Sequence, residues 1–176
     1  MTKTPTAATL LMIRPATIGD VMPIAQVHVA SWQETYPGLV PQDFLDKLDP
    51  LRRATMWTEV LSAGSRCVYV AADAEGHIVG FASGGENRTP EHPYAAELYT
   101  LYLLKAHHGK GAGKALFDAV VTHLKRDGHR SMLLWVMTGN KTEHFYKALG
   151  GKEIVRKTFE LAGAEVEEIG LGWDLL

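Results

Sequence analysis

The sequence has one cysteine, Cys67, so no disulfide can form within the chain. It has no uninterrupted apolar run of membrane length, and its first ten residues lack the basic start and apolar stretch of a secretion signal. We therefore expect a cytoplasmic protein with no membrane partner. The length of 176 residues suits one domain at 11–176, preceded by a flexible N-terminal extension at 1–10.

The sequence also lacks a large excess of charge of either sign, because it contains 18 Lys and Arg residues and 20 Asp and Glu residues. The formal net charge of −2 offers no general attraction to nucleic-acid phosphates, so we expect no nucleic-acid partner. We also expect no metal site at His107 and His108, because adjacent side chains point in different directions and cannot converge on one ion.

Hydrophobic periodicity divides the chain into strands and helices. Apolar and aromatic runs predict strands at 11–14, 66–72, 77–83, 96–104, 131–136, 153–159 and 165–173. Apolar residues at three- and four-residue steps predict helices that run from 17–20 to 36–38 and over 51–61, 113–126 and 140–149. The strand at 96–104 is apolar on both faces, so we expect it at the centre of a mixed sheet in an α/β layer fold.

A glycine-rich loop follows that central strand and leads directly into a helix, and its residues are His108, Gly109, Lys110, Gly111, Ala112, Gly113 and Lys114. Glycines let backbone N–H groups approach phosphate oxygens, and a helix N-terminus favours negative charge. The loop therefore predicts a pyrophosphate site. A turn that binds no ligand is the alternative.

Two nucleotide loops fit this segment poorly. A Walker loop needs a Ser or Thr hydroxyl for magnesium after Gly-Lys, but Ala115 follows Lys114 here. The dinucleotide fingerprint needs Gly-x-Gly-x-x-Gly, whereas these glycines stand at alternate positions. Both ATP and NAD are therefore disfavoured.

Three segments resemble the GNAT superfamily of N-acetyltransferases. Residues 108–113 are similar to its Arg/Gln-x-x-Gly-x-Gly/Ala signature, and residues 140–151 to its Asn…Phe-Tyr-x-x-Leu-Gly segment. Residues 31–41 resemble the Trp-x-x-Thr-Tyr-x-Gly-Leu stretch of many bacterial members, so the likeness covers most of residues 12–175. His108 departs from the usual Arg or Gln, and Lys105 stands where Pro is common. Because the loop binds through backbone N–H groups, we expect these departures only to adjust affinity.

The resemblance implies a mixed, mostly antiparallel central sheet with helices on both faces and a splayed central strand pair. It implies direct transfer of the acetyl group of acetyl-CoA to a primary amine, such as a small metabolite or an antibiotic, and pairing into a homodimer. The implied cofactor residues are the glycine loop from His108 to Lys114 for the pyrophosphate, backbone groups of Leu101 and Leu103 for the pantetheine arm, and Asn140 and Tyr146.

Tyr146 matches the family's tyrosine that protonates the departing CoA sulfur, since a phenol with a pKa of about 10 stays protonated at neutral pH. Glu97 is the candidate base, acting through a water, and strand alternation places it on the same face as Tyr99, Leu101 and Leu103. A packed core aromatic and a solvated strand end are the respective alternatives.

Analogy places Trp32, Glu34 and Tyr36 on the acceptor side, where Glu34, Glu86 and Glu91 would suit a cationic amine. Other readings stay open at this point. The acceptor could be a protein N-terminus or a lysine side chain. The chain could also be a sensor that binds acetyl-CoA without turnover, or a nucleotide-binding protein with an unusual phosphate loop.

Overall fold

The computed structural model describes residues 11–176, so the predicted N-terminal extension lies outside the described residues. One seven-stranded sheet runs in the order β1-β2-β3-β4-β5-β7-β6. All neighbouring strands are antiparallel except β4 and β5. The strands are β1 (Met12–Pro15), β2 (Cys67–Ala72), β3 (Ile78–Glu86), β4 (Ala96–Leu103), β5 (Met132–Met137), β6 (Lys152–Leu161) and β7 (Ala164–Trp173).

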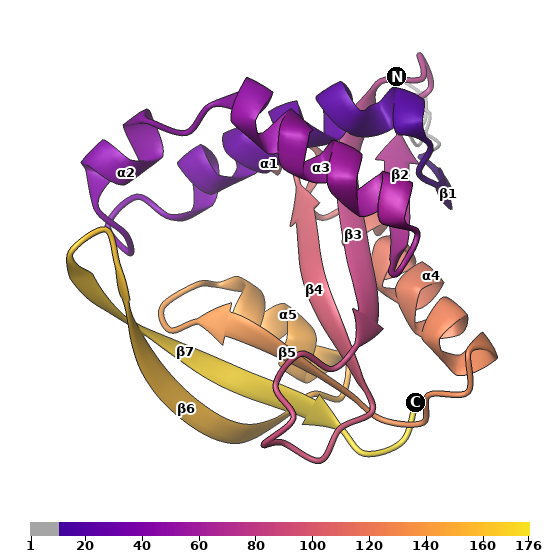
Figure 1. Cartoon of the computed structure of the whole chain (residues 1–176), viewed down its shortest axis with the longest axis vertical. Coiled ribbons are helices and arrows are strands. Elements are labelled where there is room, and N and C mark those ends of the chain that lie inside the picture. Colours follow the sequence, from indigo (N-terminus) through magenta and orange to yellow (C-terminus); the bar gives the residue numbers. More distant parts are fainter. Residues whose placement is uncertain (1–10) are drawn as a thin grey trace, which may run out of the picture.

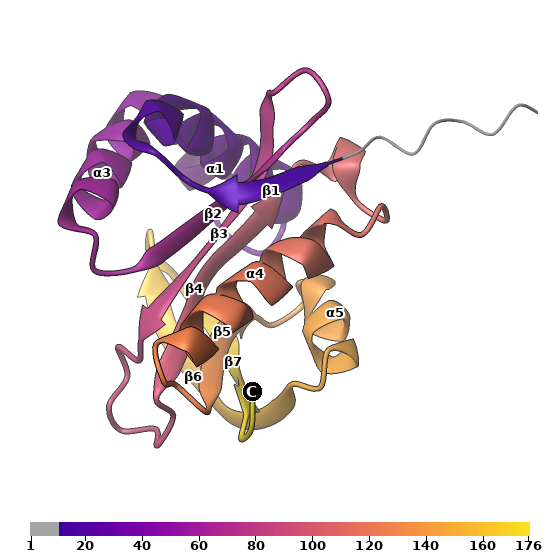
Figure 2. The same cartoon turned by 90° about the vertical axis from the view of Figure 1, so that its right-hand side faces the viewer.

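Helices cover both faces of the sheet (Figure 2). On one face, α1 (Val21–Thr35) and α3 (Pro50–Ala63) pack together, with the short α2 (Gln42–Asp46) beyond them. On the other face lie α4 (Ala112–Arg126) and α5 (Thr142–Ala148). Short 3-10 turns, η1 (Ile18–Asp20) and η2 (Lys105–His107), precede α1 and α4. The predicted mixed, mostly antiparallel sheet with helices on both faces is confirmed.

Local signals explain where the helices begin and end. Asp49 accepts a hydrogen bond from the Leu51 amide at 2.9 Å, which caps the start of α3. Gly64 ends the same helix in the left-handed conformation, with φ +63°. Thr17 and Asp20 form a capping box at the start of η1, which leads into α1.

Two apolar layers hold the helices to the sheet. Leu116, Val120 and Leu124 of α4 are fully buried or nearly so against one face. Ile24 of α1 and Trp57 of α3 are buried with Phe81 against the other. Cys67 is buried, and burial raises the pKa of its thiol to about 11.

The sheet opens between β4 and β5 (Figure 1). Their parallel pairing covers Ala96–Leu98 of β4 only, so the rest of β4 lacks β5 as a partner. The splayed strand pair is therefore confirmed. The opening starts beside a bulge, because Leu98 pairs with Gly84 and Thr100 with Ser83, which leaves Tyr99 as an extra residue in β4.

Three details differ from the sequence prediction. The strand β3 extends to Glu86 rather than ending at Ser83, and α2 was not predicted, because five residues are too few to show helical periodicity. The helix α5 begins at Thr142, two residues later than expected. Among residues 11–176, no helix is both long enough and apolar enough to cross a membrane.

Candidate active site

The glycine loop before α4 presents free backbone amides. Gly109 and Gly111 have φ angles of +71° and +85°, and a Cβ atom added to either would meet nothing within 4 Å. Within residues 11–176, the His108 amide donates to the Lys105 carbonyl at 3.1 Å, and the next amide along the chain with an acceptor belongs to Ala115, which donates to Gly111 at 3.0 Å. Open space and unpaired donors at a helix N-terminus fit an anionic group such as a diphosphate.

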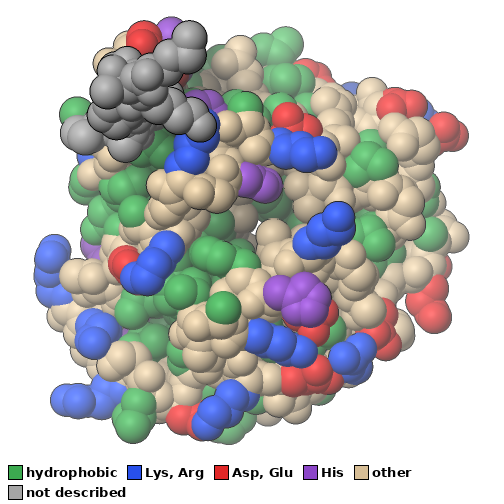
Figure 3. All heavy atoms as spheres, turned by 180° about the vertical axis from the view of Figure 1, so that it is seen from behind, with side chains coloured by type: hydrophobic (Ala, Val, Ile, Leu, Met, Phe, Trp, Pro, Cys, Tyr) green, Lys and Arg blue, Asp and Glu red, His purple; other side chains and the backbone are tan. Residues whose placement is uncertain are grey.

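Basic side chains lie around a hollow in the surface that faces away from α1 and α3. Figure 3 shows Lys, Arg and His side chains around this hollow, which lies near the middle of the view. Positive charge in this position favours an anionic ligand.

The exposed edge of β4 faces the opening. Leu104 donates to Val79 of β3 at 2.9 Å, so its neighbour Leu103 points its backbone groups the other way. The same alternation applies to Leu101, which pairs with Ala82 in that register. Backbone N–H and C=O groups of Leu101 and Leu103 are thus directed away from β3. A linear amide chain could bond to both groups of Leu101 and to the N–H of Leu103, whose carbonyl is bonded to His108.

Three side chains bond to the segment that joins β4 to α4. His108 bonds through Nε2 to the Leu103 carbonyl oxygen at 2.7 Å. Lys110 Nζ donates to the Ala106 carbonyl at 2.9 Å. At the start of η2, the Lys105 amide donates to Glu34 Oε2 at 2.9 Å. Glu34 therefore joins α1 to this segment, and it does not line the acceptor pocket described below.

Tyr146 lies in the short helix α5, buried against Phe117 of α4 and Phe145. Burial raises the pKa of the Tyr146 phenol well above its ordinary value, and the nearby phenol of Tyr102 adds to the rise. The side chain is thus both a packed aromatic and a phenol that keeps its proton. Tyr102 lines the acceptor pocket, so Tyr146 lies near one wall of that pocket without lining it.

Asn140 is buried two residues before α5, and its Oδ1 atom accepts from the amide of Thr142, the first residue of that helix, at 3.0 Å. Its side chain also lies beside the hydroxyl of Tyr36 and acts to lower the pKa of that phenol. Burial is the larger effect and raises the pKa of Tyr36. Asn140 therefore connects α5 to the C-terminal end of α1, where the acceptor side was expected.

A cavity of about 440 Å³ lies where β4 leaves β5. Its wall is largely aromatic and includes the predicted Trp32 and Tyr36 of α1. The remaining predicted acidic residues, Glu86 and Glu91, do not line it. Aromatic walls around a few polar groups are typical of small-molecule sites.

Glu97 lies in this cavity and is 3% exposed, so it is not a solvated strand end. The prediction that it shares a face with Leu101 and Leu103 is wrong. Those two leucines pack against the α4 layer, whereas Glu97 and Tyr99 line the cavity on the opposite face. The extra residue at Tyr99 is the reason, because one inserted residue reverses the alternation of side chains along a strand.

The carboxylate of Glu97 is bound on both oxygens by Arg88. Oε1 accepts from Arg88 Nη2 at 2.6 Å, and Oε2 accepts from the Arg88 amide at 2.9 Å and from its Nε at 3.3 Å. The guanidinium also lies 3.9 Å from the centre of the Tyr99 ring. Glu97 is thus placed in the cavity, and any base function requires a rearrangement of this pair.

The loop that carries Arg88 is held by the side chain of Asn87. Its Nδ2 donates to the carbonyls of Thr89, His92 and Tyr94 at 3.1, 2.9 and 2.9 Å. Its Oδ1 accepts from the amide and the hydroxyl of Thr89, both at 2.8 Å. These bonds give the loop a fixed shape next to the cavity.

Arg88, Tyr102 and Trp135 are among the cavity residues that sequence reasoning missed. Arg88 stands in a polar loop that offers no periodicity. Tyr102 and Trp135 occur in apolar strands, where an aromatic residue ordinarily packs in the core. The bulge in β4 turns Tyr102 toward α1, where it stacks on the buried His28 at 5.2 Å.

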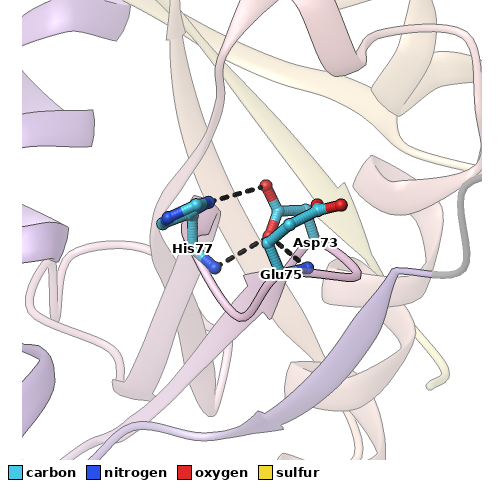
Figure 4. Close-up of side chains that lie close together, drawn as sticks. All are labelled: Asp73, Glu75 and His77. Carbon is cyan, nitrogen blue, oxygen red and sulfur yellow. Dashed lines mark hydrogen bonds and ion pairs between the residues drawn. The ribbon is translucent and has the colours of Figure 1, made fainter.

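One other cluster of ligand-type side chains lies at the turn between β2 and β3, where Asp73, Glu75 and His77 come together (Figure 4). Asp73 Oδ1 accepts from the amides of Glu75 and His77 at 3.1 and 2.8 Å. Its Oδ2 lies 3.3 Å from His77 Nδ1. These bonds account for the cluster as a side-chain-stabilised turn. The absence of a metal stays a prediction.

Comparison with known proteins bears on this arrangement. The sequence profile of the Acetyltransferase (GNAT) family matches residues 26–150. The chain is 37% identical to the uncharacterized N-acetyltransferase YuaI of Bacillus subtilis over 164 residues, 93% of each protein. It is 25% identical to the L-methionine sulfoximine/L-methionine sulfone acetyltransferase of Pseudomonas aeruginosa over 135 residues, 73% of this chain and 72% of the relative.

Among solved structures, yncA of Salmonella typhimurium with its cofactor acetyl-CoA has a TM-score of 0.71 at 20% identity, covering 94% of each chain. That likeness concerns the fold. The family profile and the Bacillus relative extend it to the sequence, over the segments that form the glycine loop, β4 and α5. The chain therefore belongs to the GNAT family of acetyltransferases and is an acetyl-CoA-dependent acyltransferase.

Proposed function

We propose that this acyltransferase moves the acetyl group of acetyl-CoA directly to the primary amine of a small molecule. The observation that carries the proposal is the cavity of about 440 Å³ at the opening between β4 and β5, which contains the buried carboxylate of Glu97. A cavity of this size suits a metabolite or an antibiotic. A protein N-terminus or a lysine side chain, the alternative acceptors, would need a path for the rest of the protein.

The residues present fit acetyl-CoA as the donor. The free amides from Gly109 to Lys114 would bind its diphosphate, with His108 and Lys110 holding the loop in place. Backbone groups of Leu101 and Leu103 would bond to the pantetheine arm, which would lie along β4 like an added strand. This path leads the thioester toward Tyr146 and the cavity.

Direct transfer then requires the acceptor, which enters as an ammonium, to lose two protons. The first passes to Glu97 through a water, and the freed nitrogen forms a bond to the thioester carbon. The carbon–sulfur bond breaks, the departing thiolate takes the hydroxyl proton of Tyr146, and the second proton of the nitrogen returns to Tyr146 through water. Because burial raises the pKa of this phenol, Tyr146 remains protonated until the thiolate forms. The products are the acetylated amine and free CoA.

A relative supports a small acceptor. The Pseudomonas protein carries L-methionine sulfoximine and L-methionine sulfone in its name, and both are small amines. A cytoplasmic location, a homodimer and a single domain over 11–176 stay predictions.

The proposal is tested by two measurements on the full chain. Titration with CoA should perturb the backbone amide signals of Gly109 to Lys114 and raise the melting temperature. Thiol release from acetyl-CoA should then be followed with amino acids, polyamines, aminoglycosides and N-terminal peptides as acceptors. Turnover of small amines supports the proposal, turnover of peptides alone supports the protein-directed alternative, and binding without turnover supports a sensor. Affinity for ATP without affinity for CoA would favour a nucleotide-binding protein.

A further inference from the structure

The acceptor cavity contains paired charges of both signs. Arg88 pairs with Glu97 at 2.6 Å, and Lys157 of β6 pairs with Glu168 of β7 at 3.2 Å. All four residues line the cavity. The two positive and two negative side chains that line the cavity therefore neutralise one another before any acceptor enters.

The carboxylate of the Arg88–Glu97 pair is more deeply buried than the carboxylate of the Lys157–Glu168 pair. The Glu97 side chain is 4% exposed and the Glu168 side chain 18%, while Arg88 extends toward solvent with 54% of its side chain exposed. Arg88 is thus the member that can move. Its guanidinium rests on the Tyr99 ring, so it can shift across that ring while its backbone stays fixed by the Asn87 loop.

A cationic amine that reaches Glu97 must replace Arg88 as the partner of this carboxylate. A simple monoamine would take the carboxylate but would offer no anion to the guanidinium that it displaces, which then has only solvent as a partner. An acceptor that also carries an anionic group avoids this loss. Its ammonium group takes Glu97, and its anion takes Arg88, so every charge keeps a partner.

Resting on the proposed function, we infer that the acceptor is a zwitterion that bears a carboxylate beside its amine, and that Arg88 selects it by this exchange of ion pairs. The planar guanidinium suits a carboxylate, which it can bind through two parallel hydrogen bonds. Arg88 is then a specificity-determining residue, and Asn87 is the positioning residue that presents it.

The test compares matched acceptors with the full-length protein. Each α-amino acid of a panel that includes L-methionine sulfone is paired with its carboxamide and with the amine that lacks the carboxyl group. We expect kcat/KM for the best amino acid to exceed that of its carboxamide by at least about tenfold, as a charged hydrogen bond requires. In Arg88→Gln this preference should shrink toward unity, and Arg88→Lys should restore only part of it.

Arg66→Gln is the matched control. Its guanidinium also lies over the Tyr99 ring, at 4.9 Å, but Arg66 neither lines the cavity nor pairs with Glu97. This variant should keep the preference of the wild-type protein. An equal loss in Arg66→Gln and Arg88→Gln would overturn the inference.

Binding separates this inference from the proposed function. Calorimetry with CoA reports the donor site, and calorimetry of the panel with the CoA-bound protein reports the acceptor site without turnover. Efficient acetylation of carboxamides or monoamines, or an unchanged preference in Arg88→Gln, would overturn the zwitterion assignment while the proposed function stands. Binding of only those acceptors that lack a carboxylate would also overturn the zwitterion assignment. Failure to bind CoA would instead overturn the proposed function.

Discussion

The imidazole of His108 is bonded to the strand that precedes it, with Nε2 2.7 Å from the carbonyl oxygen of Leu103. A carbonyl can only accept, so Nε2 carries the proton and donates. His108 replaces the Arg or Gln common at this position of the family, and here it ties the glycine loop to the edge of β4. The departure in sequence therefore has a specific structural role.

Replacing His108 should test that role. His108→Ala removes one hydrogen bond, worth about 0.5–1.5 kcal/mol, so we expect KM for acetyl-CoA to rise by about two- to tenfold with kcat nearly unchanged. His108→Arg keeps a donor and should stay close to the wild-type KM. Steady-state kinetics with varied acetyl-CoA concentration measures these KM values. An equal rise of KM in both variants would show that the hydrogen bond to Leu103 does not determine acetyl-CoA affinity.

A methyl group on the glycine loop should weaken donor binding. Gly111 has φ +85°, so Gly111→Ala strains the backbone by about 1 kcal/mol and places a Cβ atom where the diphosphate would approach. We expect the dissociation constant for CoA, measured by calorimetry, to rise by about tenfold or more, or about 1.4 kcal/mol.

Gly128 provides the matched control, because it has φ +90° and equally open surroundings beyond the other end of α4. Gly128→Ala should lower the melting temperature about as much as Gly111→Ala but leave CoA binding intact. If both variants bind CoA like the wild-type protein, the loop does not receive the diphosphate.

Removal of the Tyr146 hydroxyl should affect chemistry rather than binding. We expect Tyr146→Phe to lower kcat by about a hundredfold or more, as loss of a general acid does, while the affinity for acetyl-CoA is kept. Burial raises the pKa of this phenol above its ordinary value of about 10. If activity falls as the pH is raised toward about 10, we therefore expect the fall to come from a group other than Tyr146.

Tyr69→Phe is a suitable comparison for that variant, since it removes a hydroxyl bonded to His123, away from the cavity. It should leave kcat unchanged. An unchanged kcat in Tyr146→Phe, with intact acetyl-CoA binding, would remove Tyr146 from the mechanism.

His28 should make the fold sensitive to acid. Its Nδ1 accepts from Trp57 Nε1 at 3.1 Å, and burial, with the charge of Arg53 as a smaller cause, lowers the pKa of His28 to about 3. The unfolded chain, with a pKa of about 6.5, takes up this proton first. The free energy of unfolding should therefore fall by about 1.4 kcal/mol per pH unit as the pH drops below about 6.5.

Urea unfolding between pH of about 6.5 and about 4.5 measures this slope before carboxylates titrate. The pKa of Asp20 is lowered to about 2, chiefly by its hydrogen bond to Arg14, so its contribution is lost only at lower pH. His28→Gln should flatten the slope, and His144→Gln, at an exposed position, should not. Equal slopes in the wild-type protein and His28→Gln would contradict the assignment.

The elements that the sequence predicted well are those specified locally. The α4 stripe follows from apolar residues at helical spacing, and the glycine loop from residues that alone tolerate positive φ angles, Gly109 and Gly111. The predicted cofactor segments, with Trp32 and Tyr36, also came to lie around one opening in the sheet. Family resemblance supplied their roles, which remain to be tested.

The features that escaped prediction depend on pairing between distant residues. Nothing near Tyr99 marks it as a bulge, because the bulge is defined by the register with β3. The partner of Glu97 is nine positions away along the chain, in a loop without periodicity. Glu34 was expected near the acceptor, but its carboxylate bonds to the Lys105 amide, a contact that only the packing of α1 beside β4 creates.

The side chain of Asn87 closes the 88–94 loop on itself through hydrogen bonds to backbone groups, with the Thr89 hydroxyl as the one side-chain partner. The path of the loop is thus largely independent of which residues occupy its outer positions. Exposed residues such as Pro90 and Glu91 can vary without refolding it. Related chains that keep this asparagine could exchange one amine for another by altering a loop side chain that lines the cavity, such as Arg88, much as an antibody changes antigen on a constant framework.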